Sequence, residues 1–476
     1  MHPTLRLSIA LLLVGLIPGA LTGTGKASDP VNVVFIVADD LNTALGCYGH
    51  PTVKSPHIDR LARRGVLFER AYCQYPSCNP SRASILTGLL PERVGVLDNR
   101  TRLRDASSEV VTLPQLFRKS GYTVARVGKI FHASVPEEIG KKGFDDTASW
   151  DEVIDPVGRD KADEGMLRNL TRGRELSSAL AYHEAEGTDE EHTDGRVAME
   201  AIGLLERLRG KRFFLAVGFY RPHVPWIVPK RYFDRYPLES IRLPAEADGD
   251  RGDIPEAALT VSPPHYGLGE SDRRNAVRAF YASVSFMDEQ VGKILDALDR
   301  LKLTESTVIV FCGDHGWHLG EHGLWQKNSL FEESVRAPLI LAGPGIPSRN
   351  ATSKRIVELL DIYPTVAALA GLAAPRGLDG ADLGPLLRDP DAPWTRPAGS
   401  VVKRGRILGR SIRTDRWRCT EWDESRRGLE LYDHETDPGE TANLAADPRH
   451  AKTLDEIRQL IRERWKLVPA AREKGL

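Results

Sequence analysis

The chain has few cysteines and almost no net charge. Of its 476 residues only five are cysteine, at positions 47, 73, 78, 312 and 419, and an odd number cannot all be paired in disulfides. A disulfide-dense scaffold is therefore excluded, and at least one thiol is free or chemically altered. The formal net charge is −1, from 65 basic and 66 acidic residues. This balance excludes the basic surface of a nucleic-acid-binding protein and the composition of a charged disordered tail.

Long apolar runs are absent beyond the N-terminus. Residues 7–17 are uncharged and apolar, follow Arg6, and are too short to span a bilayer comfortably. This pattern predicts a signal peptide over residues 1–28 and export to a periplasmic, secreted or lysosome-like compartment. An uncleaved anchor is the alternative. No later segment has the pattern of a membrane helix, so no stable membrane insertion is expected.

The remainder of the chain alternates between apolar runs and amphipathic segments. An apolar run at 32–38 ends in two carboxylates, and another at 307–312 is soon followed by an Asp-His pair. Apolar residues recur at steps of three and four between 277 and 298, which predicts a long helix over 272–301. Residues 355–372 are expected to form a further helix. The alternation predicts an α/β fold, with a large and mostly parallel sheet covered by helices on both faces.

The amino-acid composition changes after Gly371, where a stretch rich in Pro, Gly and Asp predicts a surface linker. Beyond it, short apolar runs predict antiparallel strands, followed by a terminal amphipathic helix. We therefore expect a catalytic domain over 29–399 and a small α+β subdomain over 400–476. Two polar, irregular regions, at about 135–195 and 238–272, are candidates for loops that face a substrate.

Polar side chains follow four of the expected strands, at the end where ligands bind in open α/β sheets. These side chains are Asp39 and Asp40, Lys129 and His132, His223, and Asp314 and His315. The three aspartates and His315 predict a divalent-metal site. Carboxylate oxygens favour Ca²⁺ or Mg²⁺ over zinc, and we expect one Ca²⁺ ion with Mg²⁺ as the weaker candidate. Taken alone, each Asp motif also fits a strand-end cap or a turn.

Cys78 opens the sequence Cys-Asn-Pro-Ser-Arg. Pro80 suits the first turn of a helix, so Cys78 is expected at or just before a helix N-terminus, where the helix dipole favours an anion. A thiolate nucleophile is one interpretation. An unmodified thiolate, however, matches an oxygen-seeking metal poorly and is prone to oxidation in an exported protein.

This stretch, with "ASILTGLLP" after it, resembles the signature of the type I sulfatases, in which the cysteine is converted to Cα-formylglycine. Other segments resemble the same family in the same order: "NVVFIVADDL", "VGKIFH", "RPHVPW", "CGDHGWHLGEHGLWQK" and "ELYDHETDPGE". Within the family, "AVGFYRPHVPW" and "FYASVSFMDEQVGKILDALDRLKL" are most similar to iduronate-2-sulfatases. Many sulfatases carry Asn where this chain has His315, and the iduronate and choline branches share that departure.

The resemblance implies an alkaline-phosphatase-like fold with a small C-terminal antiparallel sheet, and a formylglycine nucleophile. The implied catalytic residues are Cys78, Arg82, Lys129, His132, His223 and Lys327. Position 78 would supply a hydrated aldehyde, one oxygen of which also binds the metal, and Arg82 would hold this diol. The two lysines would contact the sulfate oxygens. His132 would act as the base for the second hydroxyl, and His223 as the acid for the leaving oxygen.

The expected function is thus an exported, calcium-dependent sulfatase acting on a sulfated saccharide such as a 2-sulfated uronic acid of a glycosaminoglycan. A formylglycine-generating or sulfatase-maturating enzyme is the expected partner. The alternatives are a choline-sulfatase-like enzyme, a phosphate or phosphonate ester hydrolase, and an inactive saccharide-binding homologue. Five further residues either line a sugar subsite or pack a loop: Trp226, Trp317, His318, His322 and Trp325.

Overall fold

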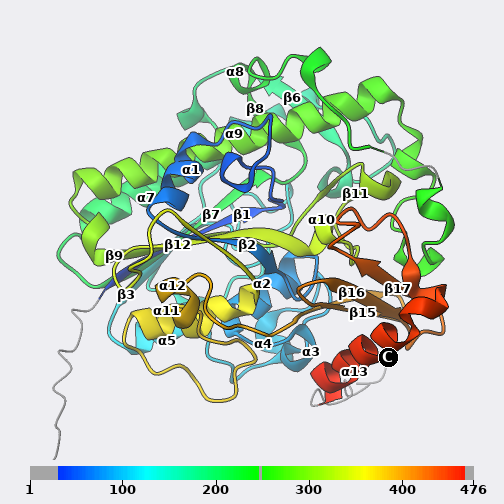
Figure 1. Cartoon of the computed structure of the whole chain (residues 1–476). Coiled ribbons are helices and arrows are strands. Elements are labelled where there is room, and N and C mark those ends of the chain that lie inside the picture. The colour runs from blue at the N-terminus through cyan, green and yellow to red at the C-terminus, as the bar shows by residue number, and fades with distance from the viewer. Residues whose placement is uncertain (1–30, 246–248, 467–476) are drawn as a thin grey trace, which may run out of the picture.

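A mixed eight-stranded sheet forms the centre of the computed structural model, which describes residues 31–245 and 249–466 (Figure 1). The expected signal peptide lies outside the described residues. The strand order is β13-β2-β12-β9-β1-β7-β3-β4, and β12 pairs antiparallel with both of its neighbours while the other pairs are parallel. The strands are β1 (Asn32–Asp39), β2 (Gly65–Tyr72), β3 (Thr123–Gly128), β4 (Glu152–Ile154), β7 (Phe213–Pro222), β9 (Thr307–Gly313), β12 (Arg336–Ala342) and β13 (Ala351–Glu358). The predicted mixed, mostly parallel sheet is confirmed.

Helices cover both faces of this sheet, because its central strands are apolar on both sides. In β1, Val33 and Phe35 belong to one hydrophobic core, and Val34 and Ile36 belong to the other. One layer contains α1 (Pro56–Arg63), α7 (Thr193–Leu208) and α9 (Glu270–Arg300); the opposite layer contains α2 (Cys78–Thr87), α5 (Leu113–Lys119), α11 (Ile362–Leu369) and α12 (Gly384–Arg388) (Figure 1). The shorter helices are α3 (Pro91–Val94), α4 (Leu103–Ala106), α6 (Arg159–Ala162), α8 (Lys230–Phe233) and α10 (Glu332–Val335).

The long helix predicted over 272–301 is confirmed as α9. Its apolar stripe faces the sheet, and Val277, Val284 and Val291 are fully buried along it. The helix expected over 355–372 is partly wrong. Residues up to Glu358 belong to β13, since the apolar pair within 355–358 completes an edge strand beside β2, and helix α11 begins only at Ile362.

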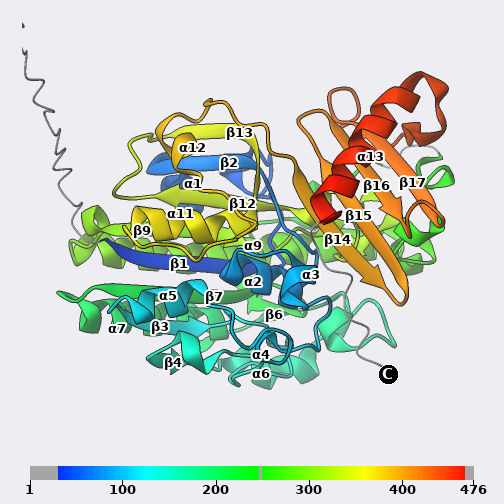
Figure 2. The same ribbon diagram turned by 90° about the horizontal axis from the view of Figure 1, so that it is seen from below.

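A second, antiparallel sheet is formed by the C-terminal part of the chain and is covered by one helix (Figure 2). Its elements are β14 (Ala398–Arg404), β15 (Ile407–Arg413), β16 (Trp417–Trp422), β17 (Gly428–Asp433) and α13 (Ala451–Lys466). This sheet shares a hydrophobic core with one face of the large sheet, through Val401, Ile412 and Trp422. The two parts are therefore packed as one body.

Two small sheets accompany the large one. These comprise β5 (Arg168–Asn169), β6 (Ala181–Ala185) and β8 (Trp226–Pro229) in one sheet, and β10 (His318–Leu319) with β11 (Trp325–Gln326) in another. Only two of their strands, β5 and β6, lie in the polar region predicted at about 135–195. All five cysteines, which lie within the described residues, are free thiols. Among residues 31–245 and 249–466, no helix combines the length and apolarity needed to cross a bilayer.

Candidate active site

Four neighbouring parallel strands end at one edge of the large sheet, and their polar termini meet there. Strand β1 pairs with β7 on one side and β9 on the other, and β7 pairs with β3. The carboxyl ends of these strands carry Asp39, Lys129, His223 and Asp314, all of them at most 5% exposed. The structure therefore gathers side chains that are up to 275 positions apart in sequence, because parallel pairing brings like ends of strands together.

Cys78 is the first residue of α2, as the sequence predicted, and it points into this cluster. Its Sγ atom lies 3.4 Å from His315 Nε2, 3.0 Å from Lys327 Nζ and 3.8 Å from Asp40 Oδ1. In a formylglycine diol, an oxygen atom would occupy the place of this sulfur. The side chain at position 78 is thus surrounded by both cationic and carboxylate groups.

The surroundings of Cys78 favour a negative charge on its side chain. Burial alone raises the pKa of the thiol, but Lys327 and Lys129 outweigh burial and hold the pKa well below its ordinary value. Contacts with His132 and His223 lower it further. The same field would stabilise any anion that occupies this position, including a deprotonated diol oxygen or the oxygens of a sulfate group.

Three buried carboxylates meet beside Cys78. Asp39, Asp40 and Asp314 each offer an oxygen within 4.8 Å of the others, and the amide of Asp40 donates a hydrogen bond of 3.0 Å to Asp314 Oδ1. Asp40 has a positive φ of 63°, which turns its side chain back toward the cluster. Its Oδ2 atom is buried without a hydrogen-bond donor among the described residues. Since like charges repel at this distance, the donor set fits a hard divalent cation.

His315 completes that donor set on the side of Cys78. Its Nε2 atom lies 3.3 Å from Asp40 Oδ1 and 3.6 Å from Asp314 Oδ1, and its Nδ1 atom contacts the carbonyl oxygen of Gly316. The backbone contact holds the ring so that Nε2 faces the carboxylates, which is how a second partner orients a metal-binding imidazole. The residues that could hold a metal are thus Asp39, Asp40, Asp314, His315 and the group at position 78.

Arg82 ties the carboxylates to the strand that bears Lys129. Its guanidinium is 1% exposed and donates to Asp314 Oδ2 at 2.9 Å and to Asp39 Oδ1 at 3.1 Å. It also donates to the carbonyl oxygens of Lys129 and Ile130, at 2.6 and 3.0 Å. Only the planar fork of an arginine can serve four acceptors in this arrangement. Arg82 therefore positions the acidic cluster, and its helix also carries Cys78.

Two lysines and two histidines supply the remaining polar groups. Lys129 pairs with Asp39 and Lys327 pairs with Asp40, so both ammonium groups lie close enough to Cys78 to act on its charge. His223 Nε2 lies 3.6 Å from Asp40 Oδ2. Burial lowers the pKa of His132, which keeps its imidazole neutral at neutral pH and able to accept a proton. All ten residues predicted from the sequence are brought to one place.

A cavity of about 520 Å³ opens beside this cluster and reaches Ser77 and Lys327. Its aromatic residues are Tyr75, Tyr266 and Trp325. Its charged residues are Lys327, Arg174, Lys403, Arg404 and Asp98. Four cations thus face a single acid, in contact with rings that can stack on a sugar.

Five residues were expected either to line a sugar subsite or to pack a loop, and one of them lines this cavity. Trp325 does so, whereas Trp226 and Trp317 are buried against Phe280 of α9. The two histidines pack beneath the loop: His318 Nε2 contacts Ser329 Oγ at 2.7 Å and His322 Nδ1 contacts Asp250 at 3.1 Å. The structure therefore favours a packing role for four of the five.

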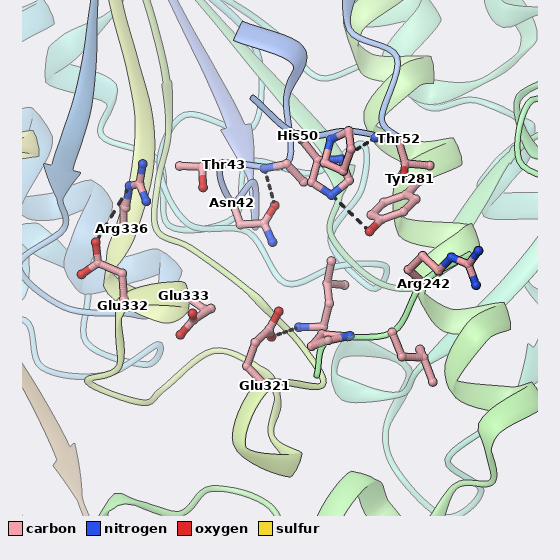
Figure 3. A pocket seen from close by; sticks show the side chains of 15 residues that line it. Asn42, Thr43, His50, Thr52, Arg242, Tyr281, Glu321, Glu332, Glu333 and Arg336 are labelled. Atoms are coloured by element: carbon pink, nitrogen blue, oxygen red, sulfur yellow. Dashed lines mark hydrogen bonds and ion pairs between the residues drawn. The ribbon is translucent and has the colours of Figure 1, made fainter. Parts of the chain in front are cut away.

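A second cavity, of about 360 Å³, is lined by none of the ten site residues (Figure 3). Glu321, Glu332 and Glu333 line it together with Arg242 and Arg336. The wall of this cavity thus has no excess of basic groups that would attract an anionic ester. The cationic cavity beside Cys78 is the better candidate for substrate.

Sequence reasoning missed three residues around the site. Arg174 lies between β5 and β6, and Lys403 lies on β14. Both are far in sequence from the segment around Cys78, and neither belongs to a recognisable motif. Asn99 lies outside every motif identified in the sequence, yet its side chain contacts Ser77 and Asn79 at the start of α2. Only the tertiary structure places these side chains near Cys78.

Comparisons with known proteins agree with this geometry. Residues 31–372 match the family model described as Sulfatase, and residues 320–466 match the one described as N-sulphoglucosamine sulphohydrolase, C-terminal. The iduronate 2-sulfatase of Mus musculus is 32% identical, over 91% of this chain and 94% of its own length.

Solved structures show the same fold. A protein in complex with its substrate D-glucosamine-2-N,6-O-disulfate superimposes with a TM-score of 0.74 at 22% identity, covering 94% of this chain and 100% of the other. The phosphonate monoester hydrolase of Agrobacterium radiobacter gives a TM-score of 0.75 at 22% identity, covering 92% and 96%. At this identity the structural similarity establishes the alkaline-phosphatase-like fold. It does not identify the substrate, which has to be inferred from the residues of the site. The family match over most of the chain is decisive: this chain belongs to the sulfatase family and is a sulfuric ester hydrolase.

Proposed function

We propose that this sulfatase hydrolyses a sulfate ester of an acidic saccharide, of the kind represented by a 2-O-sulfated uronic acid. The observation that carries the proposal is the cavity beside Cys78, where four cations face one acid and three aromatic rings are available. A sulfated sugar offers anionic groups for the cations and an apolar ring face for the aromatic side chains. A choline ester would place a quaternary ammonium in this positive field, which is unfavourable.

The proposed nucleophile is a hydrated formylglycine at position 78, produced from Cys78 by a maturation enzyme that supplies the oxidant. One hydroxyl of the diol loses its proton to solvent, favoured by the positive charge of Lys327 and Lys129, and its oxygen attacks sulfur. The bond between sulfur and the substrate oxygen breaks, and His223 donates a proton to the leaving alcohol. The second hydroxyl then gives its proton to His132. The aldehyde re-forms as its bond to the sulfate oxygen breaks, and a water molecule regenerates the diol.

Two lysines and a metal site would bind the sulfate and stabilise the charge that develops on it. Lys129 and Lys327 border the nucleophile and would contact sulfate oxygens, while Arg82 holds the carboxylates in place. A hard divalent cation bound by the aspartates and His315, which we propose to be Ca²⁺, would add positive charge at the reacting group. Such preorganised charge is usually the largest contribution to catalysis of this type.

The N-terminal segment and the domain boundaries are also assigned by proposal. We propose that residues 1–28 direct export, that residues 29–399 form the catalytic domain and that residues 400–476 form the C-terminal subdomain. Mass spectrometry of the protein recovered from its host tests the first assignment, because a cleaved chain lacks the N-terminal peptide. A full-length chain retained in the cell would overturn it.

Substrate preference is tested by incubating the mature protein separately with a 2-O-sulfated uronate disaccharide, choline sulfate and an aryl phosphate. Released sulfate and phosphate are measured by ion chromatography. We expect kcat/KM for the disaccharide to exceed that for choline sulfate by at least about tenfold. A preference for choline sulfate, or release of phosphate alone, would contradict the proposal.

The nucleophile is tested in the same assay with Cys78→Ala, which is expected to release no sulfate. Cys47→Ala is the matched control, because Cys47 is a half-buried thiol that lines a separate cavity. It is expected to keep wild-type activity. Mass spectrometry of the tryptic peptide that contains position 78 shows whether the aldehyde is present, and an intact thiol in fully active protein would rule out the formylglycine mechanism.

A further inference from the structure

The first strand of the C-terminal sheet is bonded directly to the segment that leads into Cys78. The amide of Val401 donates to the carbonyl oxygen of Gln74 at 2.9 Å. The amide of Lys403 donates to the Tyr75 hydroxyl at 2.9 Å, and this hydroxyl donates in turn to the Lys403 carbonyl oxygen at 3.4 Å. The backbone of Lys403 is therefore held in a fixed relationship to the nucleophile, three residues beyond Tyr75.

The four cations of the cavity differ in what their charged groups already contact. Lys327 is paired with Asp40 and Cys78. Arg404 donates to backbone carbonyl oxygens, among them that of Asn328 at 2.6 Å, and it lies over the Trp422 ring. The charged groups of Lys327 and Arg404 therefore already interact with other groups of the protein.

The other two cations have donors to spare. Lys403 is exposed, and within residues 31–245 and 249–466 its ammonium has no hydrogen bond or ion pair. The Arg174 guanidinium lies 4.6 Å from the centre of the Tyr266 ring, and its Nε atom is the only one of its donors that forms a hydrogen bond to another described residue, to Ser178 O. The acid of the cavity, Asp98, accepts hydrogen bonds from the amides of its own loop. Asp98, the one carboxylate that lines this cavity among the described residues, forms no ion pair with Lys403.

We propose that Lys403, assisted by Arg174, binds a second anionic group of the substrate, a carboxylate or a second sulfate on the saccharide. This inference deepens the proposed function and rests on it. The reacting sulfate is held by the buried cluster, whereas Lys403 and Arg174 lie on the wall of the adjoining cavity. A substrate held at both places is fixed in orientation, so these residues select for a dianionic sugar over a singly charged ester.

Lys403 and Arg174 can affect substrate selectivity separately from the chemical step, because they lie on elements outside the buried cluster. Lys403 comes from β14 of the C-terminal sheet and Arg174 from the insertion between β5 and β6, so neither belongs to the strand ends that perform the chemistry. Their removal weakens recognition of the second charge while the buried cluster is left intact. The C-terminal sheet thereby acquires a direct role in substrate specificity.

The test uses three disaccharides that share one sulfate ester: a 2-O-sulfated uronate, its carboxyl-reduced counterpart, and the carboxyl-reduced form with a second sulfate on the neighbouring sugar. The measured quantity is the ratio of kcat/KM for each dianionic compound to that for the singly charged one. In Lys403→Ala this ratio is expected to fall about 10- to 100-fold, mainly through KM, which is the range for losing a hydrogen bond to a charged group. The compound whose ratio falls identifies the second anion as carboxylate or sulfate.

Controls separate this inference from the proposed function. Lys403→Arg is expected to retain most of the preference, Lys403→Glu to lower it further, and Arg174→Ala to lower it by a smaller factor. Lys452→Ala, on α13 with a side chain that is 91% exposed, changes net charge equally and is expected to behave as wild type. If the wild type releases no sulfate from any compound, the proposed function fails. If it releases sulfate but Lys403→Ala and Lys403→Glu keep the ratio within about twofold, this inference alone is overturned.

Discussion

The amide of Asn79 donates a hydrogen bond of 3.0 Å to the side-chain oxygen of Asn99. The same oxygen accepts from the Ser77 hydroxyl at 3.0 Å, so one exposed asparagine holds the residues on both sides of Cys78. Ser77 is the N-cap of α2 but makes no capping bond with its own side chain. Asn99 therefore performs the capping role from another loop and positions the nucleophile.

Replacing Asn99 with Ala should lower kcat, because the first turn of α2 loses a capping acceptor and Cys78 shifts. We expect a loss of about 1 kcal/mol of stability and a reduction of kcat of about tenfold. Asn99→Asp keeps an oxygen acceptor at the helix N-terminus and should restore kcat, while its negative charge in the cavity raises KM. Steady-state kinetics check both variants. Equal kcat values for Asn99→Ala and wild type would remove the positioning role.

Removing divalent cations should destabilise the protein as well as inactivate it. Asp39, Asp40 and Asp314 are buried with carboxylate oxygens within 4.8 Å of one another, and a bound cation would relieve their repulsion. At a ligand concentration 100 times the Kd, binding adds about 2.7 kcal/mol to the free energy of unfolding. Chelation should therefore lower the Tm in calorimetry, and Ca²⁺ should restore it more effectively than Mg²⁺. An unchanged Tm, with and without chelator, would contradict a resident metal.

Arg82→Lys should be severely destabilising despite the conserved charge. A lysine ammonium cannot bridge Asp39 and Asp314 and also reach the two carbonyl oxygens that Arg82 contacts. Breaking a buried ion pair costs about 3–5 kcal/mol, so urea denaturation should reveal a loss of that order together with loss of activity. Arg93→Lys is the control. Arg93 forms a partly exposed pair with Asp379 and should cost less than about 1 kcal/mol.

The junction between the two sheets should be sensitive to acid. Arg418 of β16 is 1% exposed and pairs with Glu440 and with Glu332 of α10. Although burial raises the pKa of Glu440, Arg418 and His434 lower it to about 2, below its ordinary value of 4.5. A carboxyl whose folded-state pKa is depressed contributes stability above the unfolded-state pKa and loses it as pH falls toward the folded-state value.

The free energy of unfolding should therefore decrease between about pH 4.5 and pH 2, in part through Glu440. Glu440→Gln removes that titration, so its stability should be lower than wild type at pH 7 and should change less across the window. Denaturation curves at several pH values check this. A variant with the same pH slope as wild type would show that Glu440 does not contribute.

Local sequence patterns determined the strand-end chemistry. The apolar run of β1 followed by Asp39-Asp40, and the run of β9 followed by Asp314-His315, specify buried strands that end in ligand groups. Pro80 places Cys78 at the first residue of α2. These features depend on residues within a few positions of one another, which is the range over which periodicity and helix-start signals act.

Only the tertiary structure decided which distant side chains meet at that site. Residues 355–358 have a helical pattern but become part of β13, because pairing with β2 satisfies their backbone groups and buries their apolar side chains. Asn99 contacts the residues on both sides of Cys78 from another loop, and Lys403 is brought to the adjoining cavity by the bonding of β14 to residues 74–75. Such long-range pairings depend on complementary surfaces that form on folding, so no pattern within either segment encodes them.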